Sequence, residues 1–164
     1  MPETPLRIRD ACRADLDALV RVRPPREAHE DTLNEVQAGA VRFLVALLGE
    51  DVVGFASLYL EQPTSRAPKS QVPKLSDCHV APAHRRAGIG KSLVAAREEI
   101  ARQHGCERLY VSVHPDENPD WLEFFQRRGY QPLQAHPYEH LELRHGPDGP
   151  TAVRAQRIDL ETRL

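Results

Sequence analysis

The sequence has few cysteines and no long apolar run, and each shortage excludes a class of protein. Its longest uninterrupted apolar segment runs from Phe43 to Leu48, far short of the roughly 20 residues that a membrane-spanning helix needs. The first ten residues also lack the apolar stretch of a signal peptide. The three cysteines, Cys12, Cys78 and Cys106, are odd in number and widely spaced. They therefore predict neither a disulfide framework nor a zinc site, and they favour a reducing cytoplasm.

Lysine and aromatic residues are also scarce, and the net charge is close to zero. The 22 basic residues face 24 acidic ones, which gives a formal net charge of -2. A protein that coats nucleic acid carries a strong positive excess. We therefore expect no nucleic-acid partner and, without an apolar span, no membrane partner.

Three histidines near the C-terminus raise the question of a metal site. They are His136, His140 and His145. Pro137 interrupts any helical spacing between them, and no cysteine or carboxylate pair completes a ligand set. We therefore expect no metal.

The rest of the composition is that of one globular domain. A length of 164 residues with 40% hydrophobic residues suits a single domain over residues 1–164. Hydrophobic periodicity and turn residues predict strands at 6–9, 42–48, 52–60, 74–80, 108–114, 130–133, 141–144 and 152–160, and helices at 16–22, 27–37, 88–104 and 119–128. Asp15 is predicted to be the N-cap of the first helix. The strand–helix–strand unit between residues 74 and 114 predicts one parallel strand pair in an α/β domain with a mixed central sheet.

The segment VAPAHRRAGIGK, at positions 80–91, lies between a predicted strand and a predicted helix. The start of a helix presents unpaired backbone N–H groups at the positive end of the helix dipole, which suits a pyrophosphate. Gly88 and Gly90 let the backbone approach a phosphate without side-chain obstruction. The basic residues Arg85, Arg86 and Lys91 add positive charge at the rim.

Two common nucleotide-binding motifs do not fit this loop. A P-loop needs a glycine where Arg85 stands, and a dinucleotide fingerprint needs one where Leu93 stands. An ordinary glycine-containing turn with a solvated basic cap is the alternative that remains.

The loop resembles the coenzyme A loop of the GNAT superfamily of N-acyltransferases. The match is Arg85-x-x-Gly88-x-Gly90 after the strand, followed by a second block with Asn118-x-x-Trp121, Phe124-Phe125 and Gly129-Tyr130 at the family's spacing. The resemblance covers most of the chain and is strongest from Leu75 to Leu133. It implies a GNAT-type fold and transfer of an acetyl group from acetyl-CoA to a primary amine. A domain of the same fold that binds acyl-CoA as a sensor or scaffold, without turnover, is the alternative.

The resemblance also implies a set of cofactor-binding residues. The backbone of Cys78, His79 and Val80 would bind the pantetheine arm and polarise the thioester carbonyl. The loop would wrap the pyrophosphate with Arg86, Ala87, Gly88, Ile89, Gly90 and Lys91, with Arg85 at its rim. Asn118 would hydrogen-bond the pantetheine where two strands splay apart, although a role as a helix N-cap suits the sequence equally well.

Direct attack of an amine on a thioester needs a route for the amine proton. Glu61, at the end of the 52–60 strand, and Asp77, beside the supposed thioester, are the candidate bases. Strand alternation places Asp77 and Cys78 on opposite faces, so one of the two points away from the cleft. His79, His114 or a chain of water molecules could replace either carboxylate.

The acid that protonates the departing thiolate is also open. Members of the family often have a tyrosine where this sequence has Phe125, and a phenyl ring cannot donate a proton. Tyr130 and Tyr138 are possible substitutes, but a tyrosine in this region more often packs in the core with its hydroxyl satisfied.

The acceptor is predicted only as a class, an amine of a small molecule or a peptide. In this family the region corresponding to the acidic segment 27–35 usually covers the acceptor, so its charge favours a cationic amine. Relatives often dimerise, and pairing of the final strand with a second copy would form a homodimer.

Overall fold

The computed structural model describes residues 3–60 and 72–164. The elements are β1 (Leu6–Asp10), α1 (Leu16–Val22), α2 (Arg26–Gln37), β2 (Val41–Leu48), β3 (Asp51–Tyr59), β4 (Lys74–Val80), α3 (Ile89–Gln103), β5 (Arg108–Val113), α4 (Pro119–Arg127), β6 (Gln131–Pro132), β7 (Tyr138–Gly146) and β8 (Gly149–Arg163). One mixed sheet has the strand order β1-β2-β3-β4-β5-β8-β6, and β7 pairs with β8. Within the described ranges, no helix is both long and apolar enough to cross a membrane.

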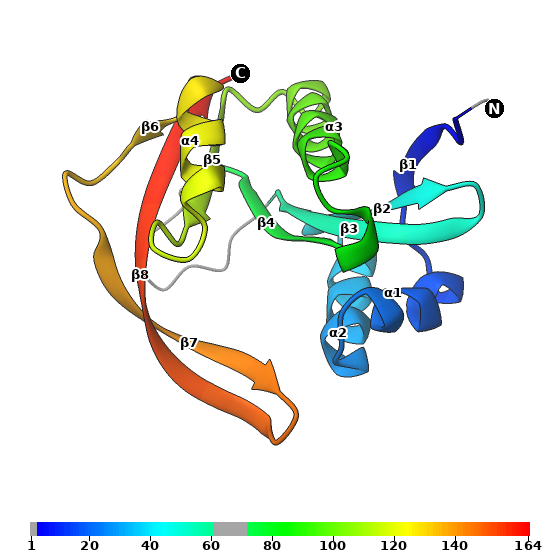
Figure 1. The fold of residues 1–164 in the computed structure, drawn as a ribbon. Coiled ribbons are helices and arrows are strands. Elements are labelled where there is room, and N and C mark those ends of the chain that lie inside the picture. The colour runs from blue at the N-terminus through cyan, green and yellow to red at the C-terminus, as the bar shows by residue number, and fades with distance from the viewer. Residues whose placement is uncertain (1–2, 61–71) are drawn as a thin grey trace.

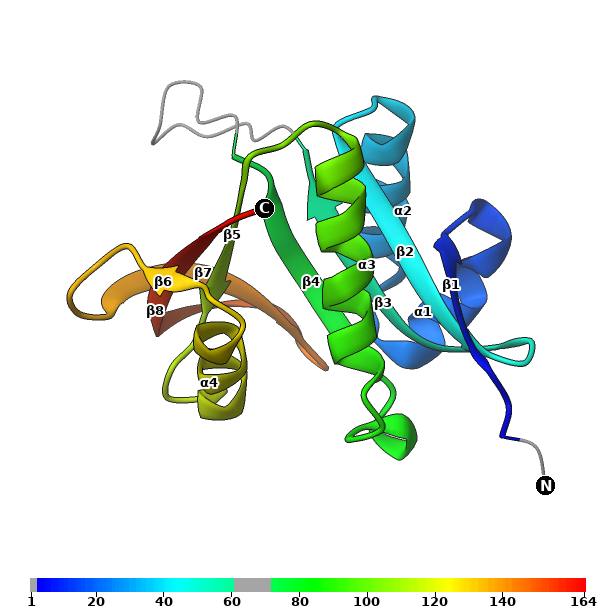
Figure 2. The ribbon, with the colours of Figure 1, turned by 90° about the horizontal axis from the view of Figure 1, so that it is seen from above.

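The first half of the sheet is covered on both faces. Helices α1 and α2 lie on one face and α3 on the other (Figures 1 and 2). This explains why β2 and β3 are apolar at almost every position: Phe43, Val45 and Phe55 pack under α1 and α2, whereas Leu44 and Ala56 pack under α3. A strand covered on both faces shows a continuous apolar run in place of alternation.

The parallel strands β4 and β5 separate soon after they begin. Their register contains only Lys74↔Tyr110 and Leu75↔Val111, so beyond Leu75 the edge of β4 that faces β5 has no strand partner. The predicted parallel pair and the predicted splay are both confirmed. Because the helices α3 and α4 follow the two diverging strands, their N-terminal ends lie near the opening.

A bulge distorts β4 just past this point. Phe55 pairs with His79 and Ser57 pairs with Ser76, so the intervening part of β4 is longer than that of β3. Asp77 lies in the bulge with a φ of 38°, a left-handed conformation that asparagine and aspartate adopt more readily than most residues. The bulge therefore changes the direction of the side chains at the end of β4.

The C-terminal strands form a long hairpin that extends away from α3 and α4 (Figure 1). β7 and β8 pair from Tyr138↔Arg157 to Gly146↔Gly149, so the strands predicted at 141–144 and 152–160 were too short. The strand predicted at 130–133 is only the two-residue β6. Solvent reaches the hairpin so freely that Leu141 and Leu143 are 63% and 69% exposed, so apolar burial does not mark where its strands begin and end.

Asp15 stands before α1, as predicted, but its side chain makes no capping hydrogen bond to that helix. Its carboxylate accepts two hydrogen bonds of 2.8 Å from the Arg9 guanidinium and one of 2.8 Å from the Cys12 backbone N–H. The bond with Arg9 holds the pKa of Asp15 at about 2. A bidentate salt bridge is stronger than a helix-capping hydrogen bond, so the predicted capping role of Asp15 is wrong.

Candidate functional site

The β4–α3 loop leads into a helix start whose backbone N–H groups have no side-chain cap. After a short 3-10 turn at Pro82–His84, Arg86 and Gly88 both have positive φ, 64° and 80°, and α3 begins at Ile89. No side chain caps α3, and its first turn contains no acidic residue. The first N–H groups of α3 are therefore available to an anion.

The three basic residues of the loop have different surroundings. Arg85 Nε donates a 3.0 Å hydrogen bond to the Val80 carbonyl, which ties the loop back to the end of β4. Arg86 and Lys91 are exposed, and Lys91 Nζ lies 5.6 Å from the centre of the Phe124 ring on α4. Positive charge is thus present at the rim of the loop, and Arg85 also holds the loop against the end of β4 through its hydrogen bond to Val80.

The two helices that flank the opening meet at Gly90 and Trp121. A Cβ atom on Gly90 would lie 3.0 Å from two carbon atoms of the Trp121 indole, which also stacks on Phe125 at 5.6 Å between ring centres. Gly90 is therefore needed for packing as well as for any approach to phosphate. By contrast, a Cβ atom on Gly88 would meet nothing within 4 Å.

Asn118 occupies the N-cap position of α4 but makes no side-chain capping bond. Its side chain is thus available to a ligand. It also lines the cavity described next.

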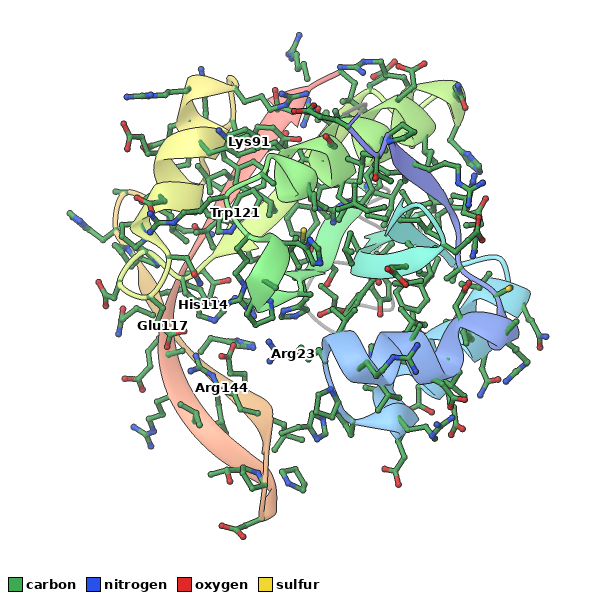
Figure 3. All side chains as sticks on the ribbon, turned by 45° about the vertical axis from the view of Figure 1, so that its right-hand side comes forward. Arg23, Lys91, His114, Glu117, Trp121 and Arg144 are labelled. Carbon is green, nitrogen blue, oxygen red and sulfur yellow. The ribbon has the colours of Figure 1, made fainter. Side chains whose placement is uncertain are left out.

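On the opposite side of the sheet from α3 lies a cavity of about 650 Å³. Its walls come from the α1–α2 connection, α2, β2, β3, the end of β4, the β5–α4 connection and the β7–β8 hairpin. The lining residues are Arg23, Pro24, Pro25, Ala28, His29, Thr32, Phe43, Phe55, Ser57, Asp77, His79, His114, Glu117, Asn118, Glu142, Leu143, Arg144 and His145. Figure 3 shows Arg23 facing His114, Glu117 and Arg144 across this space, with Lys91 and Trp121 farther up, on α3 and α4.

Asp77 and Cys78 lie on opposite sides of the sheet, as predicted from the sequence. Asp77 is exposed and lines the cavity, whereas Cys78 packs in the core beneath α3. Burial raises the pKa of the Cys78 thiol, which leaves it a poor nucleophile. Glu61, the other candidate base, lies outside the described residues.

A buried cation supports the bulge from the side of α3. The Arg97 side chain is 1% exposed; its Nη1 donates bonds of 2.9 Å to the carbonyls of Ser57 and Ser76, and its Nε bonds the Leu93 carbonyl at 3.1 Å. No carboxylate pairs with it among the described residues, and burial lowers its pKa. Arg97 therefore satisfies carbonyl groups beside the bulge, and a substitution here would disturb the geometry of Asp77.

Arg97 was not predicted from the sequence, although a signal was present. Residue 97 falls at the i+4 position between Leu93 and Ala101, both fully buried on α3. An arginine in an apolar stripe of that spacing indicates a buried charge with specific partners.

His79 is held neutral in the wall of the cavity. Its Nδ1 accepts a 2.9 Å hydrogen bond from Arg23 Nη1. Burial, helped by the charges of Arg23 and Arg85 and by His29, lowers the pKa of His79 to about 4. At neutral pH His79 is therefore uncharged, with its remaining proton on Nε2.

This low pKa predicts an acid-sensitive stability. The unfolded state, with an ordinary histidine pKa near 6.5, takes up the proton first, so the free energy of unfolding falls as the pH drops from about 6.5 to about 4. In His79→Asn, the free energy of unfolding should fall less over this pH range, by up to about 3 kcal/mol, than in the wild type. Chemical denaturation at about pH 7 and pH 4 measures it, with the exposed His104→Asn as control; an unchanged pH dependence in His79→Asn would contradict the assignment.

A charged network closes the cavity on the hairpin side. His114 Nε2 lies 3.0 Å from a Glu142 carboxylate oxygen, and Arg144 bonds both Glu142 and Glu117 at 2.8 Å. Burial acts to raise the pKa of Glu142, but the hydrogen bonds from His114 and Arg144 outweigh it, and the pKa is lowered. The network ties β7 to the β5–α4 connection.

The predicted acidic cover of the acceptor is not on the cavity side of α2. From that helix, Ala28, His29 and Thr32 line the cavity. The acidic residues of the 27–35 segment are absent from its lining, so they give no support to a cationic acceptor.

The two tyrosines considered as acids are both occupied elsewhere. The Tyr130 hydroxyl is buried and donates a 3.0 Å bond to Glu98, and burial raises its pKa. The Tyr138 hydroxyl donates to Asp159 at 2.9 Å. Phe125 is only 4% exposed, so the packing alternative describes this region.

Tyr130→Phe tests that assignment. The variant should lose about 1–3 kcal/mol of unfolding free energy, because Glu98 is buried and loses a donor. Its kcat should stay within about twofold of the wild type, which an essential acid would not allow. Denaturation and steady-state kinetics measure the two effects, and a large fall in kcat at unchanged stability would contradict the packing role.

Among residues 3–60 and 72–164, no group of three or more histidine, cysteine, aspartate or glutamate side chains could hold a metal ion.

Comparison with known proteins adds a family match. A model of the acetyltransferase (GNAT) family matches residues 9–130. The curated glucosamine 6-phosphate N-acetyltransferase of Trypanosoma brucei brucei is 31% identical over 80 residues, which is 49% of this chain and 51% of that protein. The match therefore spans about half the length of that relative.

Solved structures share the fold. A ribosomal-protein-alanine N-acetyltransferase from Brucella melitensis has a TM-score of 0.73 at 21% identity, covering 96% of this chain and 99% of that one. A putative acetyltransferase from Salmonella typhimurium, solved with its cofactor acetyl-CoA, has a TM-score of 0.74 at 15% identity, covering 98% and 94%. The predicted fold class, a mixed central sheet flanked by helices, is confirmed.

Proposed function

We propose, because this chain belongs to the GNAT family of acetyltransferases, that it transfers an acetyl group from acetyl-CoA to a primary amine. One observation carries the proposal. The uncapped start of α3 lies at the opening between β4 and β5, and the end of β4 leads from that opening into the 650 Å³ cavity. An anionic carrier on one side of the sheet can therefore meet an acceptor on the other.

The described residues suit acetyl-CoA. Arg86, Ala87, Gly88, Ile89, Gly90 and Lys91, with Arg85 holding the loop against β4, would hold the pyrophosphate through backbone N–H groups and rim charge. The unpaired edge of β4 at Cys78, His79 and Val80 offers backbone groups to the pantetheine arm, and the free amide of Asn118 would complete the contact. Bound acetyl-CoA supplies the acetyl group as an activated thioester.

On the acceptor side of the sheet, we propose that the Asp77 carboxylate accepts the proton of the attacking amine. Its carboxylate lines the cavity, and no hydrogen bond or ion pair to another described residue occupies it. A carboxylate there can orient the amine and accept its proton, directly or through water. A backbone N–H at the end of β4 would donate to the developing oxyanion.

The substrate class rests on relatives of different kinds. One is named for an amino sugar phosphate and the other for a protein alanine, and both acceptors are amines. We carry over only the amine. A single domain over residues 1–164, a homodimer through the final strand and a cytoplasmic location remain proposals; the three free cysteines are compatible with the last.

Release of free thiol from acetyl-CoA across an amine panel tests the proposed function. Turnover with at least one primary amine is the expected result. Thermal stabilisation by CoA without thiol release from any amine would favour the sensor alternative. Stabilisation by ATP but not by CoA would overturn the cofactor assignment.

A further inference from the structure

Most charges that line the cavity neutralise one another. Glu117 and Glu142 are both bonded by Arg144, and Glu142 is also bonded by His114. Two lining charges have no such partner among the described residues. These are the Asp77 carboxylate on β4 and the Arg23 guanidinium on the α1–α2 connection.

Arg23 is fixed in place but largely unused. Its carbonyl lies 2.6 Å from His29 Nε2, which anchors the backbone, and its Nη1 donates to the neutral His79. A guanidinium carries five N–H donors in a fork that matches carboxylate and phosphate oxygens. Arg23 therefore has donors left for an anion inside the cavity.

Near Asp77 the cavity presents a second unsatisfied group. The Ser57 side chain is 1% exposed, and its hydroxyl has no hydrogen-bond partner. Ser57 pairs with Ser76, the residue before Asp77, so the hydroxyl and the carboxylate belong to the same part of the cavity floor. A buried hydroxyl without a partner is costly, and a bound polar ligand would satisfy it.

We propose that the acceptor is a primary amine that also carries an anionic group, a carboxylate or a phosphate, a few bonds away. Its amine lies at Asp77 and Ser57, and its anion is held by Arg23. Arg23 contacts His79, which follows Asp77 by two residues on β4. Two residues along a strand correspond to a separation on the order of 7 Å, which is the distance expected between the amine and the anion sites. The inference rests on the proposed function and adds the chemistry of the acceptor to it.

Matched pairs of acceptors test this directly. The carboxylate arm compares β-alanine with propylamine, and the phosphate arm compares O-phosphoethanolamine with ethanolamine and glucosamine 6-phosphate with glucosamine. We expect wild-type kcat/KM to be at least about 10-fold higher for the charged member of one arm, the size of one charge-assisted hydrogen bond. The arm that shows the preference identifies the anion.

Arg23→Gln should remove the preference. We expect a fall of about 10- to 100-fold for the charged acceptor, mostly in KM, and a change within about twofold for its uncharged partner. Arg21→Gln, an exposed arginine two residues earlier that does not line this cavity, is the matched control and should change neither value.

Three results would overturn the inference while leaving acetyl transfer intact. They are equal use of charged and uncharged amines by the wild type, an equal loss for both in Arg23→Gln, and a comparable loss in Arg21→Gln. An equal loss for both acceptors would mean that Arg23 only positions His79. Absence of thiol release with every amine would be a failure of the proposed function itself.

Discussion

Asp77→Asn should lower kcat/KM for a primary amine by about 100-fold or more while the Kd for CoA stays within about twofold. The substitution removes the carboxylate that we propose accepts the amine proton, and general bases contribute on this scale. Asparagine also adopts left-handed backbone readily, so the φ of 38° at this position adds no strain. The loss should shrink at high pH, where more of the amine is already deprotonated.

Steady-state kinetics across pH, with CoA titrations, measure both effects. Asp116→Asn is the matched control, because Asp116 is exposed and does not line the cavity. Glu61→Gln is the parallel variant for the other predicted base. An unchanged pH profile of kcat/KM in Asp77→Asn would remove Asp77 from the mechanism, and the same result in Glu61→Gln would remove both carboxylates.

Gly88→Glu should weaken CoA binding by about 100-fold. It places a negative charge where the start of α3 and the exposed basic rim favour an anion. Backbone strain at a φ of 80° adds a loss of unfolding free energy on the order of 1 kcal/mol. The indole fluorescence of Trp121, the single tryptophan of the sequence, reports the titration from between α3 and α4.

Gly105→Glu is the matched control at the other end of α3. Gly105 has a φ of 76° and, like Gly88, no atom within 4 Å of an added Cβ. Both variants should lose similar stability, but only Gly88→Glu should lose affinity for CoA. Equal affinity in the two variants would show that the loop does not hold the diphosphate. Gly90 is less suitable for this test, because any side chain there also displaces Trp121.

The parts of the fold that follow from local pattern could be predicted. The run from Phe43 to Leu48 is apolar because helices cover both faces of β2, and the periodicity of α3 reflects its packing on the sheet. The parallel pair followed from one strand–helix–strand unit, and among the described strands only β4 and β5 are parallel. The splay was implied by the resemblance to the GNAT superfamily. The loop at 80–91 could be found because glycine and helix-start signals are local.

Features that depend on distant partners could not be predicted. Asp15 does not cap α1, because its carboxylate binds the Arg9 guanidinium. The length of the hairpin depends on the pairing of β7 with β8. The bulge at Asp77 leaves no mark in the sequence, because it is a mismatch of register with β3. Arg23 reaches the site only because α1 ends against β4, 56 residues away in the sequence.

The narrow attachment between β4 and β5 has a consequence for the cohesion of the molecule. With two register pairs between them, the C-terminal strands are joined to the N-terminal half chiefly through the core under α3, where Val94 and Ala101 cluster with Leu109. A compound bound in the opening between β4 and β5 would add contacts that join the two halves. Because such a ligand binds only the folded protein, a tight inhibitor would also raise the free energy of unfolding.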